Sequence, residues 1–196
     1  MSGFYESAQW REFKMGHPGG EKSTKWLLSH CKNGGRLLDL CCGFGASSAV
    51  AASMGFEVVG LDKAEIAAQA LSAYPEIDFR AWSGEALPFD DCYFDAVLCE
   101  CSLSLLDNQS FILSELTRVL NPDGRFLVSD IYDAKAFPCL SGFKMLCGED
   151  RSGDLKEFAV QWLWETGTRF PCSCSADGYF VCVYAKDRYK NAICEV

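Results

Sequence analysis

The sequence predicts an α/β fold, and three observations support this prediction. An apolar run at 38–40 leads through a turn with two glycines into a run of small residues at 46–53, which is the order strand, turn, helix. Further short apolar runs alternate with segments of helical pattern along the chain. Two acidic residues, Asp39 and Asp62, stand at or after the ends of the first two runs. Open sheets of this kind bind ligands at the carboxyl ends of their strands.

The turn at 41–45 is the predicted ligand site. Gly43 and Gly45 have no Cβ, so the backbone can turn tightly and let a ligand approach closely. The free N–H groups at the start of the next helix face the same point and favour a nucleotide-type ligand. A dinucleotide fingerprint requires glycine or alanine at the position of Ser48, so an NAD-dependent oxidoreductase is disfavoured.

Length and composition are those of one globular domain that covers residues 1–196. The chain is 49% hydrophobic and has a mean hydropathy of +0.00. No apolar run approaches the ~20 residues that cross a bilayer, and the N-terminus lacks a signal-peptide pattern, so we expect a cytoplasmic protein without membrane contact. The net charge of -9 would repel a phosphate backbone, which argues against nucleic acid and favours a small-molecule substrate.

The twelve cysteines are expected to be reduced thiols, because the chain lacks a secretion signal and is long enough to form a core without disulfides. We predict no metal site, since paired CxxC spacing is the convincing sign of zinc. That spacing is missing from each close group of cysteines, which are Cys41 with Cys42, Cys99 with Cys101, and Cys172 with Cys174.

The segment before residue 21 has an irregular pattern, with aromatic side chains scattered among charges. Two interpretations stay open. The segment forms a lid that brings Tyr5 and His17 to the substrate, or it is a helix packed on the sheet that ends in a turn at Pro18.

The other elements follow from hydrophobic periodicity and from the positions of glycine and proline. Gly55 is suited to end the helix after the glycine turn, and Pro75 the next one. The segment 121–124 is expected to stop a helix and form a turn. The predicted helices lie at 21–30, 47–55, 64–73, 108–120 and 155–165, and the predicted strands at 38–40, 56–61, 77–81, 94–99, 125–131, 143–147 and 179–185.

Asp62 follows the second predicted strand, about where a ribose-binding acid is expected. A carboxylate there can accept hydrogen bonds from both ribose hydroxyls. The alternative is a structural role at the N-terminus of the helix that begins near Lys63. The spacing from the glycine turn favours ribose.

Several motifs resemble those of class I S-adenosylmethionine (SAM) methyltransferases. The stretch from Asp39 to Gly45 resembles motif I, with Cys41 at the first glycine position. The loop 83–89 ends in Leu-Pro-Phe and, with the following Phe-Asp-Ala-Val strand, resembles the adenine loop and the fourth strand. The stretch 118–124 resembles an RVLxPGG turn, with Asp123 replacing the first glycine. The resemblance runs from about residue 36 to 132 and is to the ubiquinone/menaquinone-biosynthesis-like type.

This resemblance implies a Rossmann-like, doubly wound, three-layer sandwich. Its sheet would be mainly parallel and seven-stranded, with the last strand antiparallel. We expect an N-terminal helical or lid segment at 1–30, a SAM-binding core at 31–132 and a variable C-terminal part at 133–196. A helix at 155–165 would then interrupt what is normally a strand hairpin.

The resemblance also implies the site residues. Ser83 stands where an aspartate commonly holds the adenine amino group, and the backbone N–H of Gly84 remains available to the ring. Glu100 and Cys101 follow the fourth strand and are the catalytic candidates, Glu100 as a base or as a partner of the sulfonium and Cys101 as a soft ligand. Tyr5, His17 and Ser102 are the substrate candidates. The cofactor candidates are Asp39, Cys41, Cys42, Gly43, Gly45, Asp62, Lys63, Ser83, Gly84, Glu85 and Cys99.

The implied function is transfer of a methyl group from SAM to a small-molecule acceptor by in-line displacement, with S-adenosylhomocysteine as product. The protein would act as a monomer or homodimer. Two alternatives stay open. One is a SAM-binding regulatory protein without catalysis, and the other is metalloid or thiol methylation through converging cysteines, among them Cys99, Cys101, Cys172 and Cys174.

Overall fold

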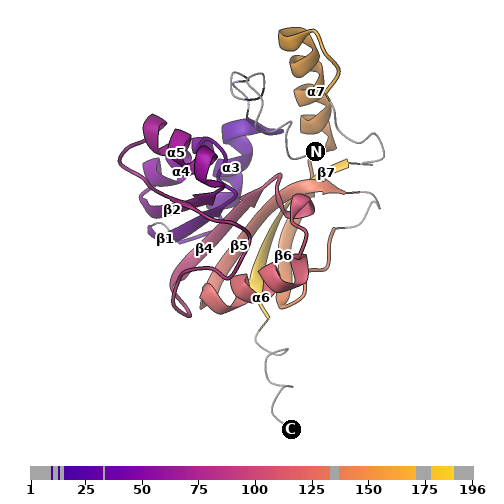
Figure 1. Ribbon diagram of the computed structural model, residues 1–196. Helices are drawn as coiled ribbons and strands as arrows, with labels where there is room; N and C mark the ends of the chain where they lie inside the picture. The colour runs from indigo at the N-terminus through magenta and orange to yellow at the C-terminus, as the bar shows by residue number, and fades with distance from the viewer. Residues whose placement is uncertain are drawn as a thin grey trace.

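The computed structural model describes residues 10, 13, 16–32, 34–132, 137–170 and 178–187. A seven-stranded sheet forms the centre, in the order β3-β2-β1-β4-β5-β7-β6 (Figure 1). The strands are β1 (Gly35–Leu40), β2 (Phe56–Asp62), β3 (Asp78–Ala81), β4 (Phe94–Glu100), β5 (Leu120–Tyr132), β6 (Phe143–Asp150) and β7 (Gly178–Lys186). The helices are α3 (Gly20–Leu28), α4 (Ala46–Ser53), α5 (Ala64–Ala73), α6 (Gln109–Val119) and α7 (Ser152–Thr166), with a 3₁₀ turn η1 (Leu103–Leu105).

The sheet is parallel from β3 to β5, and β7 runs antiparallel to both of its neighbours. The expected mainly parallel sheet with an antiparallel last strand is therefore confirmed. The chain builds β1, β2 and β3 in one direction and then returns to place β4 on the other side of β1. Ligands of open α/β sheets bind at this change of direction, outside the carboxyl ends of the strands.

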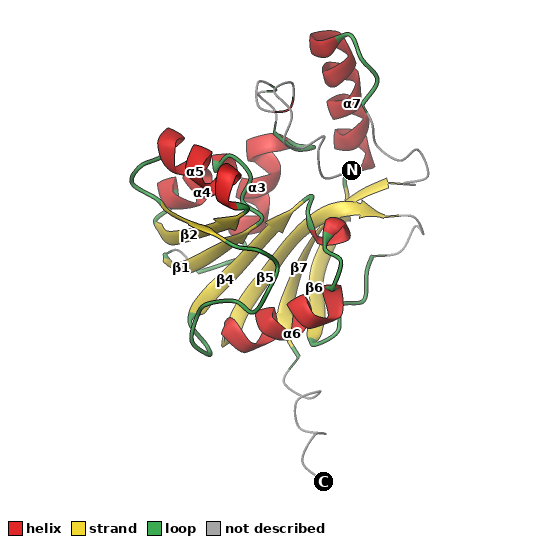
Figure 2. Ribbon diagram, in the orientation of Figure 1, coloured by secondary structure: helices red, strands yellow, loops and turns green. Residues whose placement is uncertain are grey.

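Two cores lie on opposite faces of the sheet, which makes the three layers (Figure 2). Neighbouring residues of β1 enter different cores, because side chains alternate along a strand. Leu38 and Leu40 pack in the core that contains α6, whereas Leu37 packs in the core that contains α3, α4 and α5. The predicted apolar face of the helix is buried throughout, at Ile112, Leu113, Leu116 and Val119 of α6 and at Leu120, the first residue of β5.

The predicted elements agree with the observed ones except near residue 120. β5 already begins at Leu120, which pairs with Phe94, and the register then shifts so that Arg125 pairs with Ala96. The segment 121–124 is thus an irregularity inside β5 and does not precede it. The physical reason is that Leu120 is fully buried beside the start of β4, so tertiary packing extends the strand.

Helix α7 lies between β6 and β7, as predicted, and projects beyond the end of the sheet (Figure 1). Its buried side chains, Phe158 and Trp162, pack with Trp10, Phe13 and Phe170. The rings of Phe13 and Phe158 meet edge to face with centroids 5.0 Å apart. Part of the N-terminal segment is therefore packed against α7, whereas Tyr5 of the predicted lid lies outside the described residues.

Among the described helices, none has the length and apolar composition that a bilayer crossing requires. The described residues 137–142, between β5 and β6, contain no helix.

Candidate functional site

The glycine turn follows β1 and is held by the neighbouring strand. The N–H of Cys42 donates to the carbonyl of Leu61 at 3.0 Å, and Gly45 N–H donates to the carbonyl of Cys42 at 3.0 Å. Gly45 has φ 85°, and a Cβ there would lie 2.7 Å from Cζ of Phe79. A Cβ on Gly43 would meet no atom within 4 Å. Gly45 is therefore required by packing, while Gly43 leaves open space above the turn.

Cys41 takes the left-handed conformation, with φ 59°. A side chain in that region is strained, and glycine is the usual residue there. The backbone thus keeps the geometry of a glycine at the first motif position although the residue is a cysteine. Burial, with the nearby Asp62 and Asp39 carboxylates, raises the pKa of the Cys41 thiol, so the thiol is neutral.

Asp62 ends β2 and is turned toward the glycine turn. Its Oδ2 accepts the N–H of Gly43 at 2.8 Å, and its Oδ1 accepts the N–H of Lys63 at 2.7 Å. Lys63 is exposed and precedes α5 as its N-cap, without a side-chain capping bond. Each carboxylate oxygen can accept more than one hydrogen bond, so Asp62 retains capacity for a ligand hydroxyl.

Asp39 lies inside the protein, 2% exposed, and accepts a hydrogen bond from Oγ of Ser48 at 2.5 Å. Burial raises the pKa of Asp39 to about 7, and the carboxylates of Glu100 and Asp62 add to the effect. The serine that breaks the dinucleotide fingerprint therefore holds the acid of the first strand.

The carboxylate of Glu100, at the end of β4, forms the centre of a polar cluster. Its Oε2 accepts hydrogen bonds from Ser47 Oγ at 2.7 Å and Thr24 Oγ1 at 2.9 Å. Nε2 of His17 lies 3.5 Å from the same oxygen. The other oxygen, Oε1, is buried and has no hydrogen-bond partner among the described residues. Three segments of the chain thus meet on one side of this carboxylate.

His17 connects the N-terminal segment to this cluster. Its Nε2 lies 3.2 Å from Oγ1 of Thr24, and its Nδ1 lies 3.1 Å from the carbonyl oxygen of Pro18. The hydroxyl of Thr24 donates to Glu100, so the oxygen of this hydroxyl can still accept a hydrogen bond. Sequence reasoning selected His17 but missed Thr24 and Ser47. Ser47 had a signal, since it lies two residues after Gly45 at the start of α4.

The thiols near the end of β4 do not converge. Cys99 is fully buried in the core beside α6, whereas Cys101 packs with the core of the opposite face. Sγ of Cys101 lies 3.4 Å from the hydroxyl of Tyr179, and burial raises the pKa of both Cys99 and Cys101. Ser102 donates from Oγ to the carbonyl of Glu100 at 2.8 Å. The thiols of Cys99 and Cys101 therefore stay protonated.

The converging-thiol hypothesis has no support in the described structure. Cys172 and Cys174 lie outside the described residues. In the part of the chain that the structure describes, there is no group of three His, Cys, Asp or Glu residues that could hold a metal ion.

The predicted adenine loop leaves the sheet close to Asp62. Trp82 donates its backbone N–H to the carbonyl of Asp62 at 2.7 Å and its indole N–H to the carbonyl of Glu85 at 3.0 Å. Ser83, Gly84 and Glu85 are exposed. Gly84 has φ 91°, and a Cβ there would meet no atom within 4 Å, so this loop also offers open space.

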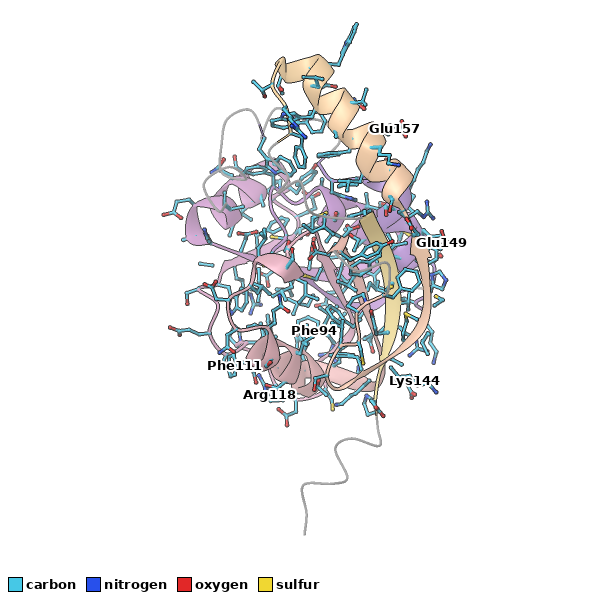
Figure 3. All side chains as sticks on the ribbon, turned by 90° about the vertical axis from the view of Figure 1, so that its right-hand side faces the viewer. Phe94, Phe111, Arg118, Lys144, Glu149 and Glu157 are labelled. Atoms are coloured by element: carbon cyan, nitrogen blue, oxygen red, sulfur yellow. The ribbon has the colours of Figure 1, made fainter. Side chains whose placement is uncertain are left out.

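Arg118 clamps the remainder of that loop from α6. Its guanidinium donates to the carbonyls of Leu87 at 2.9 Å and Phe89 at 2.7 Å, and to the carboxylates of Asp91 and Glu115. Glu115 in turn accepts the N–H of Leu87 at 2.8 Å. Figure 3 places Arg118 on α6, at the opposite end of the molecule from Glu157 of α7.

A pocket of about 410 Å³ lies at the other edge of the sheet, lined by Asp91, Gly142 and Lys186 among others. Asp91 precedes β4 and Gly142 precedes β6, so this edge carries the amino ends of the parallel strands. The pocket also borders Arg118, whose five N–H groups all have partners. We therefore assign the pocket no part in the candidate site.

Known proteins agree with this arrangement. A family described as "Methyltransferase domain" matches residues 38–128, which run from β1 through the glycine turn to β5. This part of the chain is therefore similar to a methyltransferase domain. Demethylmenaquinone methyltransferase of Renibacterium salmoninarum is 37% identical to this chain over 98 residues, which are 50% of this chain and 41% of the relative. That of Bacillus licheniformis is 29% identical over 186 residues, 86% of this chain and 73% of the relative. For several curated relatives the match spans about half of their own length.

Solved structures share the fold of this chain. Phosphoethanolamine N-methyltransferase 2 of Haemonchus contortus, in complex with SAM, aligns with a TM-score of 0.73 at 17% identity, over 94% of this chain and 56% of that one. The [4+2]-cyclase SpnF aligns with a TM-score of 0.69 at 19% identity, over 85% and 81% of the two chains. A cyclase among these neighbours means that the fold alone does not decide the reaction.

Proposed function

We propose that this protein is a methyltransferase that transfers a methyl group from SAM to a small-molecule acceptor. The observation that carries the proposal is the glycine turn inside the matched domain. Its open position at Gly43 is bonded to Asp62, and both lie where open α/β sheets bind ligands. The acidic chain, with its net charge of -9, favours a small acceptor over nucleic acid.

The residues present fit this cofactor. Gly43 and Gly84 leave space that a Cβ would fill, which suits close approach of a ligand to the backbone. Asp62 has acceptor capacity for ribose hydroxyls, and Ser83 and the N–H of Gly84 are exposed beside it for the adenine. Oε1 of Glu100 is a buried acceptor that needs a donor. SAM offers ribose hydroxyls, an adenine ring and positive charge to these groups.

The remaining candidates have supporting roles in the proposal. The turn contains Cys41, Cys42 and Gly45. Asp39 joins the end of β1 to α4 by accepting a hydrogen bond from Ser48. Lys63 and Glu85 flank the ribose and adenine positions. Because the side chain of Cys99 is buried in the core, this residue can contribute only its backbone.

When bound, SAM supplies a methyl group on a positively charged sulfur, which an acceptor takes by in-line displacement. The chain's own task is then to align the acceptor and exclude water. His17 and Ser102, with Tyr5, are the proposed acceptor-side residues. Cys101 is proposed to line the site as a neutral thiol, and Glu100 to act through its unpartnered oxygen.

Names of relatives suggest where to search for the acceptor. Several are called demethylmenaquinone methyltransferases, so quinols and phenols are the first compounds to try. The cytoplasmic location, the monomeric or homodimeric state and the boundaries at residues 30 and 132 stay predictions.

The test is a calorimetric titration of the purified protein with SAM and with S-adenosylhomocysteine, with NAD as the competing ligand. We expect both adenosyl compounds to bind and NAD not to displace them. Folded protein that binds neither would overturn the proposal. Labelled methyl transfer to a panel of quinols, phenols, thiols and arsenite would then separate an enzyme from a SAM-binding protein without catalysis.

A further inference from the structure

The two oxygens of the Glu100 carboxylate differ in their surroundings. Oε2 is occupied by the hydroxyls of Ser47 and Thr24 and faces His17, whereas Oε1 has no partner among the described residues. The side chain is only 5% exposed, so bulk water does not readily compensate. An unsatisfied acceptor on a buried charged group is costly, so a ligand that brings a donor to Oε1 is favoured.

Strand order decides which part of a ligand reaches Glu100. The loop 83–85 follows β3, Asp62 ends β2, the glycine turn follows β1, and Glu100 ends β4. These four strands are consecutive in the sheet, with spacings of about 4.8 Å. If adenine and ribose lie at β3 and β2, as proposed above, the amino-acid end of the cofactor extends over β1 to β4.

The charges around Glu100 favour a cation at this end. The carboxylates of Asp62 and Glu100 are both close enough to Asp39 to add to the raised pKa of that buried acid, so three acidic side chains lie near one another here. On Oε2 the contacts come from the hydroxyls of Thr24 and Ser47 and from the imidazole of His17. A positively charged donor at Oε1 would offset the negative charge of these acids and satisfy the unpartnered oxygen.

We propose that Oε1 of Glu100 receives the ammonium group of the amino-acid part of SAM. This inference rests on the proposed function and deepens it, because it assigns Glu100 to cofactor binding and not to proton removal from the acceptor. His17, Thr24 and Ser47 then act as positioning residues that hold Oε2 and leave Oε1 directed at the ligand.

The experiment compares two ligands that differ at the relevant group. S-adenosylhomocysteine and 5′-methylthioadenosine share the adenosine and the thioether, but only the first has an ammonium group. In calorimetric titrations, Glu100→Gln should weaken the binding of S-adenosylhomocysteine by roughly 10- to 100-fold, as for loss of a charge-assisted bond. The affinity for methylthioadenosine should stay unchanged. Asp62→Asn is the matched control and should weaken both ligands, because both contain the ribose.

Methylthioadenosine binding also reports that the Glu100→Gln site is folded. Unchanged binding of S-adenosylhomocysteine, or equal weakening of both ligands, would overturn the assignment while the proposed function stands. Wild-type protein that binds neither ligand would overturn the proposed function itself, and the assignment with it.

Discussion

The backbone N–H of Gly43 donates a 2.8 Å hydrogen bond to Oδ2 of Asp62, nineteen residues further along the chain. This bond joins the turn after β1 to the end of β2 at the carboxyl edge of the sheet. Asp62 therefore has a structural role in the turn as well as its proposed role toward ribose. The two roles can be separated by measuring stability and ligand binding on the same variant.

Asp62→Ala should weaken the binding of SAM by roughly 1.5–3 kcal/mol, because hydrogen bonds to a charged group are lost. It should also lower the free energy of unfolding by about 1 kcal/mol, since the N–H of Gly43 loses its partner. Calorimetry and urea denaturation measure the two effects. A folded variant with unchanged SAM affinity contradicts the ribose assignment.

Gly45→Ala and Gly43→Ala should differ in what they damage. The first adds a Cβ 2.7 Å from Phe79 at φ 85°, and should cost roughly 2–4 kcal/mol of stability from strain and overpacking. The second meets no atom within 4 Å, and should cost about 1 kcal/mol from strain alone while reducing SAM affinity. Equal stability losses, or full SAM affinity in Gly43→Ala, would contradict this division.

Cys41→Gly should lower the free energy of unfolding by about 1–2 kcal/mol less than Cys147→Gly does. Glycine relieves the left-handed strain at Cys41, whose φ is 59°, and relieves none at Cys147 in β6. Both side chains are partly buried, which makes the pair a matched comparison. Urea denaturation gives the difference, and equal losses would mean that Cys41 carries no such strain.

Asp39→Asn should stabilise the protein in a pH-dependent manner. The pKa of Asp39 is raised from 3.8 to about 7 by burial, so as pH rises the unfolded chain loses this proton first. Wild-type stability therefore falls by about 1.4 kcal/mol per pH unit between pH 4 and 7 from this group. The advantage of the variant should grow from pH 5.5 to 7 and stay constant above it.

The control for that experiment is Asp107→Asn, in an exposed turn. This variant measures, over the same pH range, the effect of replacing an aspartate by asparagine at an exposed position. An Asp39→Asn advantage that is independent of pH would show that Asp39 is ionised throughout.

Arg118→Met should lower the free energy of unfolding by roughly 2 kcal/mol, because the carbonyls of Leu87 and Phe89 and the carboxylate of Glu115 lose charged donors. Arg80→Met is the control, since Arg80 pairs with Asp78 at the surface and such pairs contribute about 0–1 kcal/mol. Similar losses in the two variants, measured by urea denaturation, would argue against the clamp.

Much of the fold could be predicted because the signals are local. Helix α5 has the predicted bounds, since Pro75 marks its end and its apolar side chains repeat at helical spacing. The error at Leu120 arose where packing against Phe94 extended β5 across a segment rich in turn-forming residues. The motif residues of the candidate site could be found because glycines and strand-end acids recur at fixed distances.

The polar cluster at Glu100 could not be predicted, because its members are far apart in sequence. Ser47 and Thr24 lie 53 and 76 residues from Glu100. The place of Ser47 at the start of α4 indicated a position near the glycine turn but not its bond to Glu100, and Thr24 has no pattern that distinguishes it from a solvent-exposed residue. The same holds for Phe79, whose ring makes Gly45 necessary.

The sequence by itself determined the order of strands and helices along the chain, the family resemblance and the glycine turn, because hydrophobic periodicity, turn residues and short motifs act within a few residues. Only the tertiary structure decided which oxygen of Glu100 is occupied, that Cys99 and Cys101 face different cores, and that Trp10 and Phe13 pack on α7. Those facts depend on which distant segments share a face of the sheet, and they arise when the apolar surfaces of those segments are buried together.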